Sequence, residues 1–314
     1  MLTVIGEGLV DVVQRPSGIQ AHVGGSPLNV AVGLARLDHP VQFIGRYGRD
    51  AYGESVAAHL KSSSVLLPIG PDELPTSVAT ALIDDDGAAS YTFELAWELP
   101  GLADRLPFML QATTLLHTGS IATMLAPGAA EVLSAVEHAH PLATISFDPN
   151  CRPAISPDVA AAREQAEDFV AASDIVKASD EDLLWLYPHR TLEESMAAWL
   201  DLGPSLLALT RGANGPVLMT GQGRVEIPGE PITVADTVGA GDSFMAGLIS
   251  GLAQMDMLGA AGRPHLRNLS PDDLHALAAY ANRAAAITCS RQGANPPTSA
   301  ELGPLTRSFS ARQA

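Results

Sequence analysis

The fold of this chain is decided by one late stretch, Ala235-Asp236-Thr237-Val238-Gly239-Ala240-Gly241-Asp242-Ser243-Phe244-Met245-Ala246-Gly247. It begins as a turn of small residues and runs into the apolar segment 244–253, which predicts a tightly packed helix that starts near Gly239. The first N–H groups of a helix lack intrahelical partners and carry partial positive charge, and Gly239, Ala240 and Gly241 leave room for an anion. The stretch therefore predicts an anion site built from backbone amides.

Asp242 is the unusual residue of this stretch. A carboxylate beside a bound phosphate repels it, unless the carboxylate is needed to accept a proton. Asp242 is therefore a candidate general base. The alternative is that it caps or charges the first turn of the helix, as acidic residues often do.

Composition limits the classes of protein. The chain has 314 residues, of which 46% are hydrophobic and 17% charged, and this suits one large α/β domain. A formal charge of −17 argues against nucleic acid or an anionic membrane surface as partner, because both attract basic patches. Lys61 and Lys177 are the only lysines, so phosphate has to be held mostly by backbone amides, Mg²⁺ and a few arginines.

The cysteines and the N-terminus indicate the compartment. Cys151 and Cys289 form no CxxC pair, and we expect both to be buried or incidental thiols. The first residues lack a basic region, and no apolar run approaches the length of a membrane span. We expect a cytoplasmic protein.

The motif Gly239-Ala240-Gly241-Asp242, preceded by Asp236-Thr237, resembles the second signature of the PfkB, or ribokinase-like, carbohydrate kinase family. In that family the aspartate deprotonates the acceptor hydroxyl, and the Gly-Ala-Gly amides hold the transferring phosphoryl group. The resemblance implies ATP and Mg²⁺ as cofactors and a doubly wound, mostly parallel α/β sheet flanked by helices. It further implies one domain over residues 1–306, a small β lid from segments of about 10–22 and 76–98, a C-terminal tail at 307–314 and a homodimer through the lid.

The N-terminal strand, expected at 2–6, is followed by Gly6-Glu7-Gly8-Leu9-Val10-Asp11, which nearly matches the dinucleotide motif GxGxxG. Asp11 stands where the third glycine should allow close helix packing, and an apolar stretch follows instead of a helix that could face a pyrophosphate. We therefore favour sugar hydroxyls over NAD as the partner of Asp11.

A second motif, Gly24-Gly25-Ser26-Pro27-Leu28-Asn29-Val30-Ala31, opens a predicted helix with Ser26 as N-cap and Pro27 in the first turn. The amide of Asn29 can both donate to and accept from hydroxyls, although a capping role fits equally well. This segment resembles the family's first signature, in which the paired glycines and the asparagine contact the sugar. Its GGSPxNVA form is associated with fructokinase-like members.

Two further segments indicate the lid and its surroundings. Segment 46–53 resembles a family turn, and Asp50 is expected to cap a helix that reaches Leu60. Strands at 76–82 and 90–95 flank an acidic hairpin turn at 84–87, which we interpret as solvated rather than metal-binding. Fructokinases often carry Phe-Tyr-Arg at the end of this hairpin, whereas this chain has Phe93-Glu94-Leu95-Ala96-Trp97. Trp97 is expected to stack on a sugar or to cover the core of the lid, and both alternatives stay open.

The motif Asp148-Pro149-Asn150-Cys151-Arg152 follows a predicted strand at 144–148. Pro149 prevents regular helix there, so these polar groups occupy a fixed loop at the carboxyl end of a strand, where open parallel sheets bind ligands. The motif resembles fructokinases and 2-keto-3-deoxygluconate kinases, which makes Asn150 and Arg152 candidate substrate contacts. Arg152 would bind an acid, keto or phosphorylated end of the substrate; the alternative is an internal salt bridge to Asp148.

The nucleotide and ion sites are implied by the resemblance. Ser179 and Asp182 replace the family's N-x-x-E motif, so Asp182 is a candidate for Mg²⁺ through water or a plain helix cap. Thr210 and Gly212 belong to a turn used against the nucleotide, and Asn282 would lie near the adenine. A candidate K⁺ site would be bounded by Asp236 and the carbonyls of Thr288, Arg291 and Gly293, although Pro297 stands where ribokinases can add a serine.

These features together predict an ATP-dependent kinase that phosphorylates a primary hydroxyl of a small sugar, with fructose favoured. The chain lacks the P-loop motif GxxxxGK[ST] and the HRD and DFG motifs of protein kinases. 2-Keto-3-deoxygluconate and ribose stay open as acceptors, whereas the 148–152 motif argues against a nucleoside. The non-enzyme alternative is a catalytically silent regulator that binds sugar or nucleotide, and an intact Asp242 argues against it.

Overall fold

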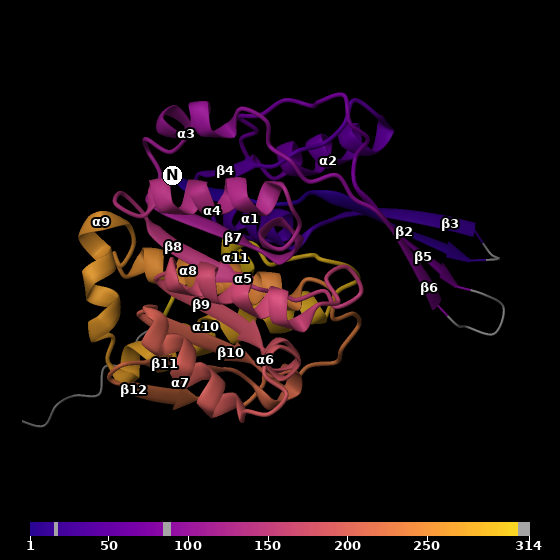
Figure 1. The fold of residues 1–314 in the computed structure, drawn as a ribbon. Helices are drawn as coiled ribbons and strands as arrows, with labels where there is room; N and C mark the ends of the chain where they lie inside the picture. Colours follow the sequence, from indigo (N-terminus) through magenta and orange to yellow (C-terminus); the bar gives the residue numbers. More distant parts are fainter. Residues whose placement is uncertain (16–17, 84–88, 307–314) are drawn as a thin grey trace, which may run out of the picture.

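A computed structural model describes residues 1–15, 18–83 and 89–306. Within these residues, an eight-stranded sheet has the order β12-β11-β10-β9-β8-β7-β1-β4 (Figure 1). Its neighbouring strands run parallel from β4 to β10, and only the pairs that involve β11 are antiparallel. The strands of this sheet are β1 (Leu2–Ile5), β4 (Val41–Ile44), β7 (Leu115–Gly119), β8 (Thr144–Asp148), β9 (Ile175–Ser179), β10 (Leu206–Thr210), β11 (Val217–Thr220) and β12 (Gly223–Glu226).

Helices cover both faces of this sheet, because successive side chains of each buried strand point to opposite sides. In β10, Leu206 and Ala208 join one apolar core, and Leu207 and Leu209 join the other. The first core is completed by α1 (Ser26–Arg36), α2 (Ala51–Ser62), α8 (Ala240–Gln254) and α10 (Pro271–Cys289). The second is completed by α3 (Leu102–Met109), α4 (Gly128–Ala139), α5 (Val159–Ala171), α6 (Asp180–Leu186) and α7 (Leu192–Leu202). Short helices lie at α9 (Gly259–Gly262), α11 (Ser299–Leu302), η1 (Ser120–Thr123), η2 (Gly212–Asn214) and η3 (Arg263–Asn268).

Helix α8 is buried between α1 and α10, as its small residues predict. A Cβ added to Gly33 of α1 would lie 2.8 Å from the Cβ of Ala246, and one added to Gly247 would lie 3.0 Å from Ala281 of α10. The predicted start of this helix is confirmed, because α8 begins at Ala240 with Gly239 as its N-cap. Close packing therefore fixes the position of its first turn.

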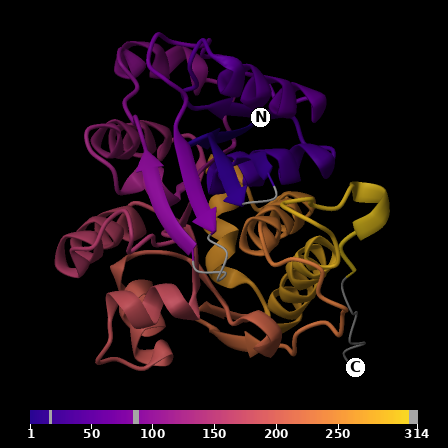
Figure 2. The ribbon, with the colours of Figure 1, turned by 90° about the vertical axis from the view of Figure 1, so that its right-hand side faces the viewer.

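A second, four-stranded sheet has the order β3-β2-β5-β6 and extends away from the main sheet, to the right in Figure 1. It consists of β2 (Leu9–Arg15), β3 (Gly18–Gly24), β5 (Val78–Ile83) and β6 (Ala89–Glu94). Figure 2 views the molecule from the side of this sheet. The two segments predicted to form a lid thus pair with each other, through the parallel pair β2–β5. The acidic turn 84–87 and the tail 307–314 lie outside the described residues.

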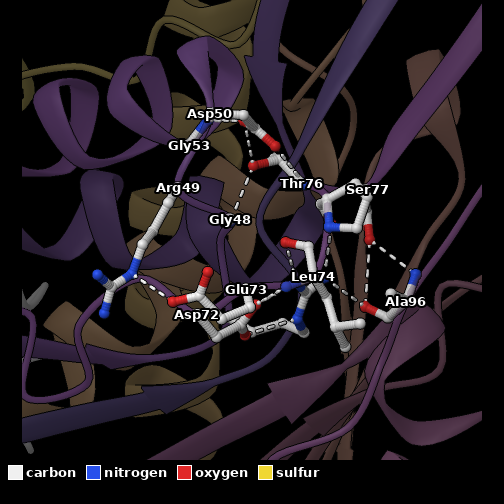
Figure 3. Close-up of polar contacts among 12 residues, drawn as sticks. Gly48, Arg49, Asp50, Gly53, Asp72, Glu73, Leu74, Thr76, Ser77 and Ala96 are labelled. Carbon is white, nitrogen blue, oxygen red and sulfur yellow. Dashed lines mark hydrogen bonds and ion pairs between the residues drawn. The ribbon is translucent and has the colours of Figure 1, made fainter.

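Polar contacts tie the root of the lid to α2 (Figure 3). Asp50 caps α2, as predicted, by accepting a hydrogen bond from the N–H of Gly53 at 2.8 Å. The same carboxylate accepts from the N–H and the hydroxyl of Thr76, both at 2.8 Å, just before β5. After β6, the N–H of Ala96 donates to the Ser77 hydroxyl at 3.1 Å. Both ends of the β5–β6 hairpin are therefore anchored.

Arg46 lies beneath these contacts and is 3% exposed. Its Nε and Nη2 donate to the two carboxylate oxygens of Asp72 at 3.0 and 2.7 Å. It also donates to the carbonyls of Leu74 at 2.8 Å, Pro75 at 3.0 Å and Ala96 at 3.1 Å. One guanidinium therefore holds the strand that enters the hairpin and the strand that leaves it.

Two local expectations require correction. Ser26 is not an N-cap: α1 has Gly25 in that place with no side-chain capping bond, and the Ser26 hydroxyl bonds elsewhere. Trp97 packs in the core that contains α3 and α4, and its Nε1 donates to the carbonyl of Ala122 at 2.9 Å. Its ring therefore neither covers the core of the lid nor lines the smaller of the two cavities described below. Helix α10 begins at Pro271, because Ser270 forms a capping box with Asp273.

Within the described part of the chain, no single helix is both long and apolar enough to cross a membrane. Helix α8 and segment 259–268 pass that test of length and composition only as a pair bent by 79°.

Candidate active site

The carboxyl ends of the parallel strands meet at one edge of the main sheet, where ligands bind in open α/β folds. Two cavities open there, with volumes of about 380 and 810 Å³. The smaller lies between the lid and the strand ends, and the larger lies beside α6, η2 and α10. Both are lined by Asn150, Arg152, Lys177, Thr237, Ala240 and Gly241. The start of α8 is therefore the wall that the two cavities share.

Asp242 points toward the smaller cavity from the first turn of α8. Its Oδ1 accepts from the hydroxyl of Ser26 at 2.7 Å, and its Oδ2 accepts from Nδ2 of Asn29 at 2.8 Å. The N-cap of α8 makes no side-chain capping bond, so Asp242 does not cap the helix, although it is the acidic residue of its first turn. Burial raises the pKa of Asp242, against the lowering effect of Ser26 and Asn29. A carboxylate with a raised pKa takes up a proton more readily than an ordinary aspartate.

The turn before α8 is shaped by glycine. Gly239 has φ of +75°, and a Cβ there would lie 2.7 Å from the Cβ of Ala294. A Cβ on Gly241 would lie 3.1 Å from Nζ of Lys177. With Ala240, these residues line the smaller cavity, and the anion site at their backbone amides stays a prediction.

The smaller cavity contains most of the predicted sugar contacts. Its lining includes Asp11, Gly25, Asn29, Asn150 and Arg152. Gly24 lies behind Asp11, because a Cβ on Gly24 would lie 2.3 Å from Oδ2 of that aspartate. Gly25 has φ of +113°, and a Cβ there would lie 2.5 Å from the carbonyl oxygen of Glu7. Gly25 is therefore required where the chain passes the backbone of Glu7, whereas a side chain at Gly24 would displace the carboxylate of Asp11.

Arg152 does not pair with Asp148, so that alternative is wrong. Its Nη1 donates to the side chain of Asn150 at 2.7 Å and to the carbonyls of Asn150 and Cys151 at 3.1 and 3.0 Å. Asp148 instead forms a buried ion pair with Lys177, with 2.7 Å between Oδ2 and Nζ. Arg152 thus remains beside both cavities and is not consumed by an internal salt bridge.

Glu7 is a lining residue whose role the sequence did not reveal. It is 4% exposed, and its Oε2 accepts from the N–H of Ala122 at 3.0 Å. Burial raises its pKa to about 7, although its own backbone, Ser120, Ala122 and Arg152 act in the opposite direction. Its place just after the buried strand β1, between Gly6 and Gly8, was the available signal.

Lys177 is the second unforeseen residue. The rarity of lysine suggested that amides and arginines would hold phosphate, yet Lys177 lines both cavities. A lysine inside an otherwise apolar strand was the signal, since a charged residue is seldom fully buried without a partner.

The larger cavity contains the predicted nucleotide contacts. Its lining includes Ser179, Asp182, Thr210, Gly212 and Asn282. Nδ2 of Asn282 donates to the carbonyl of Pro228 at 3.1 Å, and the hydroxyl of Thr210 donates to the carbonyl of Ala178 at 3.4 Å. The cavity's volume of about 810 Å³ is large enough for a nucleotide, and residues from β9, β10 and α10 bound it.

Asp182 forms a capping box with Ser179 at the start of α6, and its Oδ1 accepts from the N–H of Cys151 at 2.7 Å. In the described ranges, no group of three or more His, Cys, Asp or Glu side chains could hold a metal ion. This donor set fits Mg²⁺ only as one carboxylate acting through water, since Mg²⁺ usually keeps several waters and takes its remaining ligands from substrate phosphates.

The residues of the candidate K⁺ site do lie together. Asp236 accepts from the N–H groups of Val238 at 3.1 Å and Gly293 at 2.9 Å. The carbonyl of Thr288 accepts from the N–H of Arg291 at 3.0 Å. These contacts join the loop after α10 to the turn that precedes α8.

This chain belongs to the pfkB family of carbohydrate kinases, whose model matches residues 2–301. It is accordingly a phosphotransferase that acts on a sugar hydroxyl, as predicted. The expected doubly wound, mostly parallel α/β fold is confirmed as well.

Proteins similar to this chain include several fructokinases. The chain is 33% identical to a fructokinase of Rhizobium leguminosarum bv. trifolii over 267 residues, which cover 82% of this chain and 81% of that protein. It superposes on a fructokinase from Xylella fastidiosa with bound ATP with a TM-score of 0.85, at 25% identity and 96% coverage of each chain. A fructokinase from Vibrio cholerae, crystallised with fructose, ADP and calcium ion, gives a TM-score of 0.77 at 25% identity, with 98% of this chain and 99% of that chain covered.

Proposed function

We propose that this protein is an ATP-dependent fructokinase that phosphorylates a primary hydroxyl of fructose. The observation that carries the proposal is the position of Asp242, which faces the smaller cavity at the wall that it shares with the larger one. A base in that position can reach a hydroxyl held on one side and a phosphoryl group presented from the other. The fructokinase relatives favour fructose as the acceptor.

In the proposed reaction, the sugar hydroxyl attacks the γ-phosphorus of ATP, and the bond from that phosphorus to the β,γ-bridging oxygen breaks. Asp242 accepts the hydroxyl proton, while Ser26 and Asn29 hold its carboxylate in place. The amides around residues 239–241 stabilise the charge on the transferring group. Asp182, through water, and the phosphates of ATP would hold Mg²⁺, which would supply positive charge against the phosphates.

The charges around the smaller cavity favour a neutral sugar. Asp11, Asp242 and Glu7, whose pKa is about 7, place three acidic groups on its lining, against the cations Arg152 and Lys177, and Lys177 is already paired with Asp148. An acceptor with its own carboxylate, such as 2-keto-3-deoxygluconate, would be repelled unless Arg152 bound it. Ribose also lacks a charge, so charge alone does not exclude it. A regulator without activity is disfavoured because it has no use for a base beside its phosphates.

We also propose that two copies associate through the lid. Its exposed apolar side chains are Ile19, Leu82 and Tyr91, which are 66%, 47% and 62% exposed. Exposed apolar groups on neighbouring strands are typical of an interaction surface. Sedimentation velocity of Ile19→Lys against the unchanged protein tests this: the variant should sediment as a monomer, and an unchanged dimer would contradict the role of the lid.

Activation by K⁺ belongs to the same proposal, because the turn before α8 would be braced by a cation beside Asp236. The turnover number in KCl should exceed that in tetramethylammonium chloride at equal ionic strength. Equal rates would remove K⁺ from the mechanism. The charge of −17 argues against nucleic acid or an anionic membrane as partner, and we propose a cytoplasmic enzyme.

The test of the main proposal is ADP release from Mg·ATP with fructose, 2-keto-3-deoxygluconate, ribose, adenosine or no acceptor. Turnover with fructose in clear excess is expected. In Asp242→Asn, kcat should fall at least ~100-fold while fructose and ATP still bind, given the usual contribution of a general base. Near-normal turnover in this variant would refute the role of Asp242, and preferred turnover of another acceptor would replace fructose.

A further inference from the structure

Lys177 and Asp148 form an ion pair inside the protein, at the carboxyl ends of the neighbouring strands β9 and β8. Nζ of Lys177 lies 2.7 Å from Oδ2 of Asp148, and the two side chains are only 4% and 1% exposed. Removing two charges from water is expensive, and a well-packed apolar pair is often at least as stable. Stability alone therefore does not explain this pair.

The ammonium group is placed at the junction of the two cavities. Lys177 lines both of them, and a Cβ on Gly241 would lie 3.1 Å from its Nζ, so the amine lies beside the first turn of α8. The cationic side chains that line both cavities are Lys177 and Arg152. A phosphoryl group transferred across the wall that the cavities share would lie near this amine.

Lys177 remains charged in this position. Burial alone lowers the pKa of its ammonium, but the carboxylates of Asp148, Asp182 and Asp242 outweigh that effect, and its pKa lies above the usual range. These three carboxylates leave the local charge negative before any phosphate arrives. The transfer of a phosphoryl group brings further negative charge to the same place, where a fixed cation lowers its energy most.

We propose that Lys177 is a catalytic residue whose ammonium contacts the phosphoryl group in transit at the first turn of α8, and that Asp148 is the positioning residue that holds it there. This inference rests on the kinase function proposed above. Lys177 keeps all its protons throughout, because the acceptor proton goes to Asp242. Its contribution is a preorganised positive charge, which the substrate complex needs less than the transition state.

The experiment must separate this role from a structural one. Lys177→Met alone would leave the buried carboxylate of Asp148 unpaired, so we would combine it with Asp148→Asn in a double variant. This double variant is compared with the single variant Lys177→Gln, whose amide can still donate a hydrogen bond to Asp148. Lys61→Met is the matched control, because Lys61 is the other lysine of the chain and lies exposed on α2. Circular dichroism and thermal midpoints are measured first, and the variant that keeps the native fold is then assayed.

We expect kcat to fall ~100-fold or more in the folded variant, as for the loss of one transition-state donor, with the KM for fructose changed less than ~3-fold. Lys61→Met should match the unchanged enzyme. A second readout compares two affinities: that for ADP alone, and that for ADP with aluminium fluoride and fructose. The second set mimics the phosphoryl group during transfer. The variant should lose affinity selectively for the mimic.

Other outcomes overturn the inference. A folded variant with kcat within ~3-fold of the unchanged enzyme, or with equal losses for ADP and for the mimic, would show that Lys177 does not stabilise the transfer. Loss of the fold in both variants would make the pair structural. Failure of the unchanged enzyme to turn over any acceptor would instead overturn the proposed function, so the two failures are distinguishable.

Discussion

Replacing Arg46 by methionine removes the guanidinium that holds both ends of the β5–β6 hairpin. The three carbonyls of Leu74, Pro75 and Ala96 each lose a donor, which costs about 1 kcal/mol apiece. Asp72 is 35% exposed, so its ion pair is partly screened by water and adds no more than about 1 kcal/mol. We therefore expect Arg46→Met to lower the free energy of unfolding by about 4 kcal/mol.

Arg49 provides a matched control a few residues away, and Figure 3 shows it next to the same segment. Its Nε lies 3.2 Å from Oε1 of Glu73, with the two side chains 65% and 85% exposed. An ion pair in water contributes little, so Arg49→Met should cost less than about 1 kcal/mol. The two variants make the same chemical change, and they differ in burial and in the number of bonds lost.

Urea titrations followed by far-UV circular dichroism measure both free energies of unfolding. The reasoning requires a clearly larger loss for Arg46→Met than for Arg49→Met. If the two losses agree within about 0.5 kcal/mol, the buried network contributes no more than a surface pair. The lid root would then have to be held by the Asp50 and Ser77 contacts alone.

Further predictions concern the two cavities. Because burial raises the pKa of Glu7 from 4.5 to about 7, the folded state binds this proton more tightly than the unfolded chain, so stability present below pH 4.5 is lost as the pH rises through 7. Glu7→Gln should remove up to about 3 kcal/mol of that pH dependence in melts between pH 5 and 8, and an unchanged profile would contradict it. Gly25→Ala should raise the KM for fructose at least ~10-fold and leave ATP binding intact, because the added Cβ would collide with the carbonyl of Glu7. The control Gly70→Ala should change neither quantity, because a Cβ there meets nothing within 4 Å. Equal effects of the two substitutions would refute this steric argument. Both cysteines line the larger cavity, but Cys151 is buried and Cys289 is partly exposed. Mg·ATP should slow maleimide labelling of Cys289, while Cys151 stays unlabelled. Labelling of Cys289 at the same rate with and without nucleotide would place ATP elsewhere.

Local patterns predicted the parts of the site that are local in the chain. The start of α8 follows from a run of small residues at 239–241, and the first turn of α1 follows from the paired glycines and Pro27. Both depend on backbone geometry that neighbouring residues determine. The same holds for Asp50, which caps a helix three residues from its partner.

Contacts between distant segments could not be predicted in this way. The hydroxyl of Ser26 is an obvious N-cap in sequence, yet it binds Asp242, because packing α1 against α8 brings the two first turns together. The pair between Asp148 and Lys177 depends on β8 and β9 being neighbours in the sheet. Trp97 is buried because the chain leaves the lid at Ala96 and passes under α4.

The parallel pair β2–β5 has a consequence for the order of folding. Strand β2 follows β1, and β5 follows β4 and α2, so the pair joins two segments that the main sheet also joins through β1 and β4. Closing a long loop costs entropy, but that cost is already met once β1 and β4 have paired. Amide hydrogens of β2, β3, β5 and β6 should therefore exchange sooner than those of β7 and β8, and the lid should be the last part of the protein to fold and the first to open.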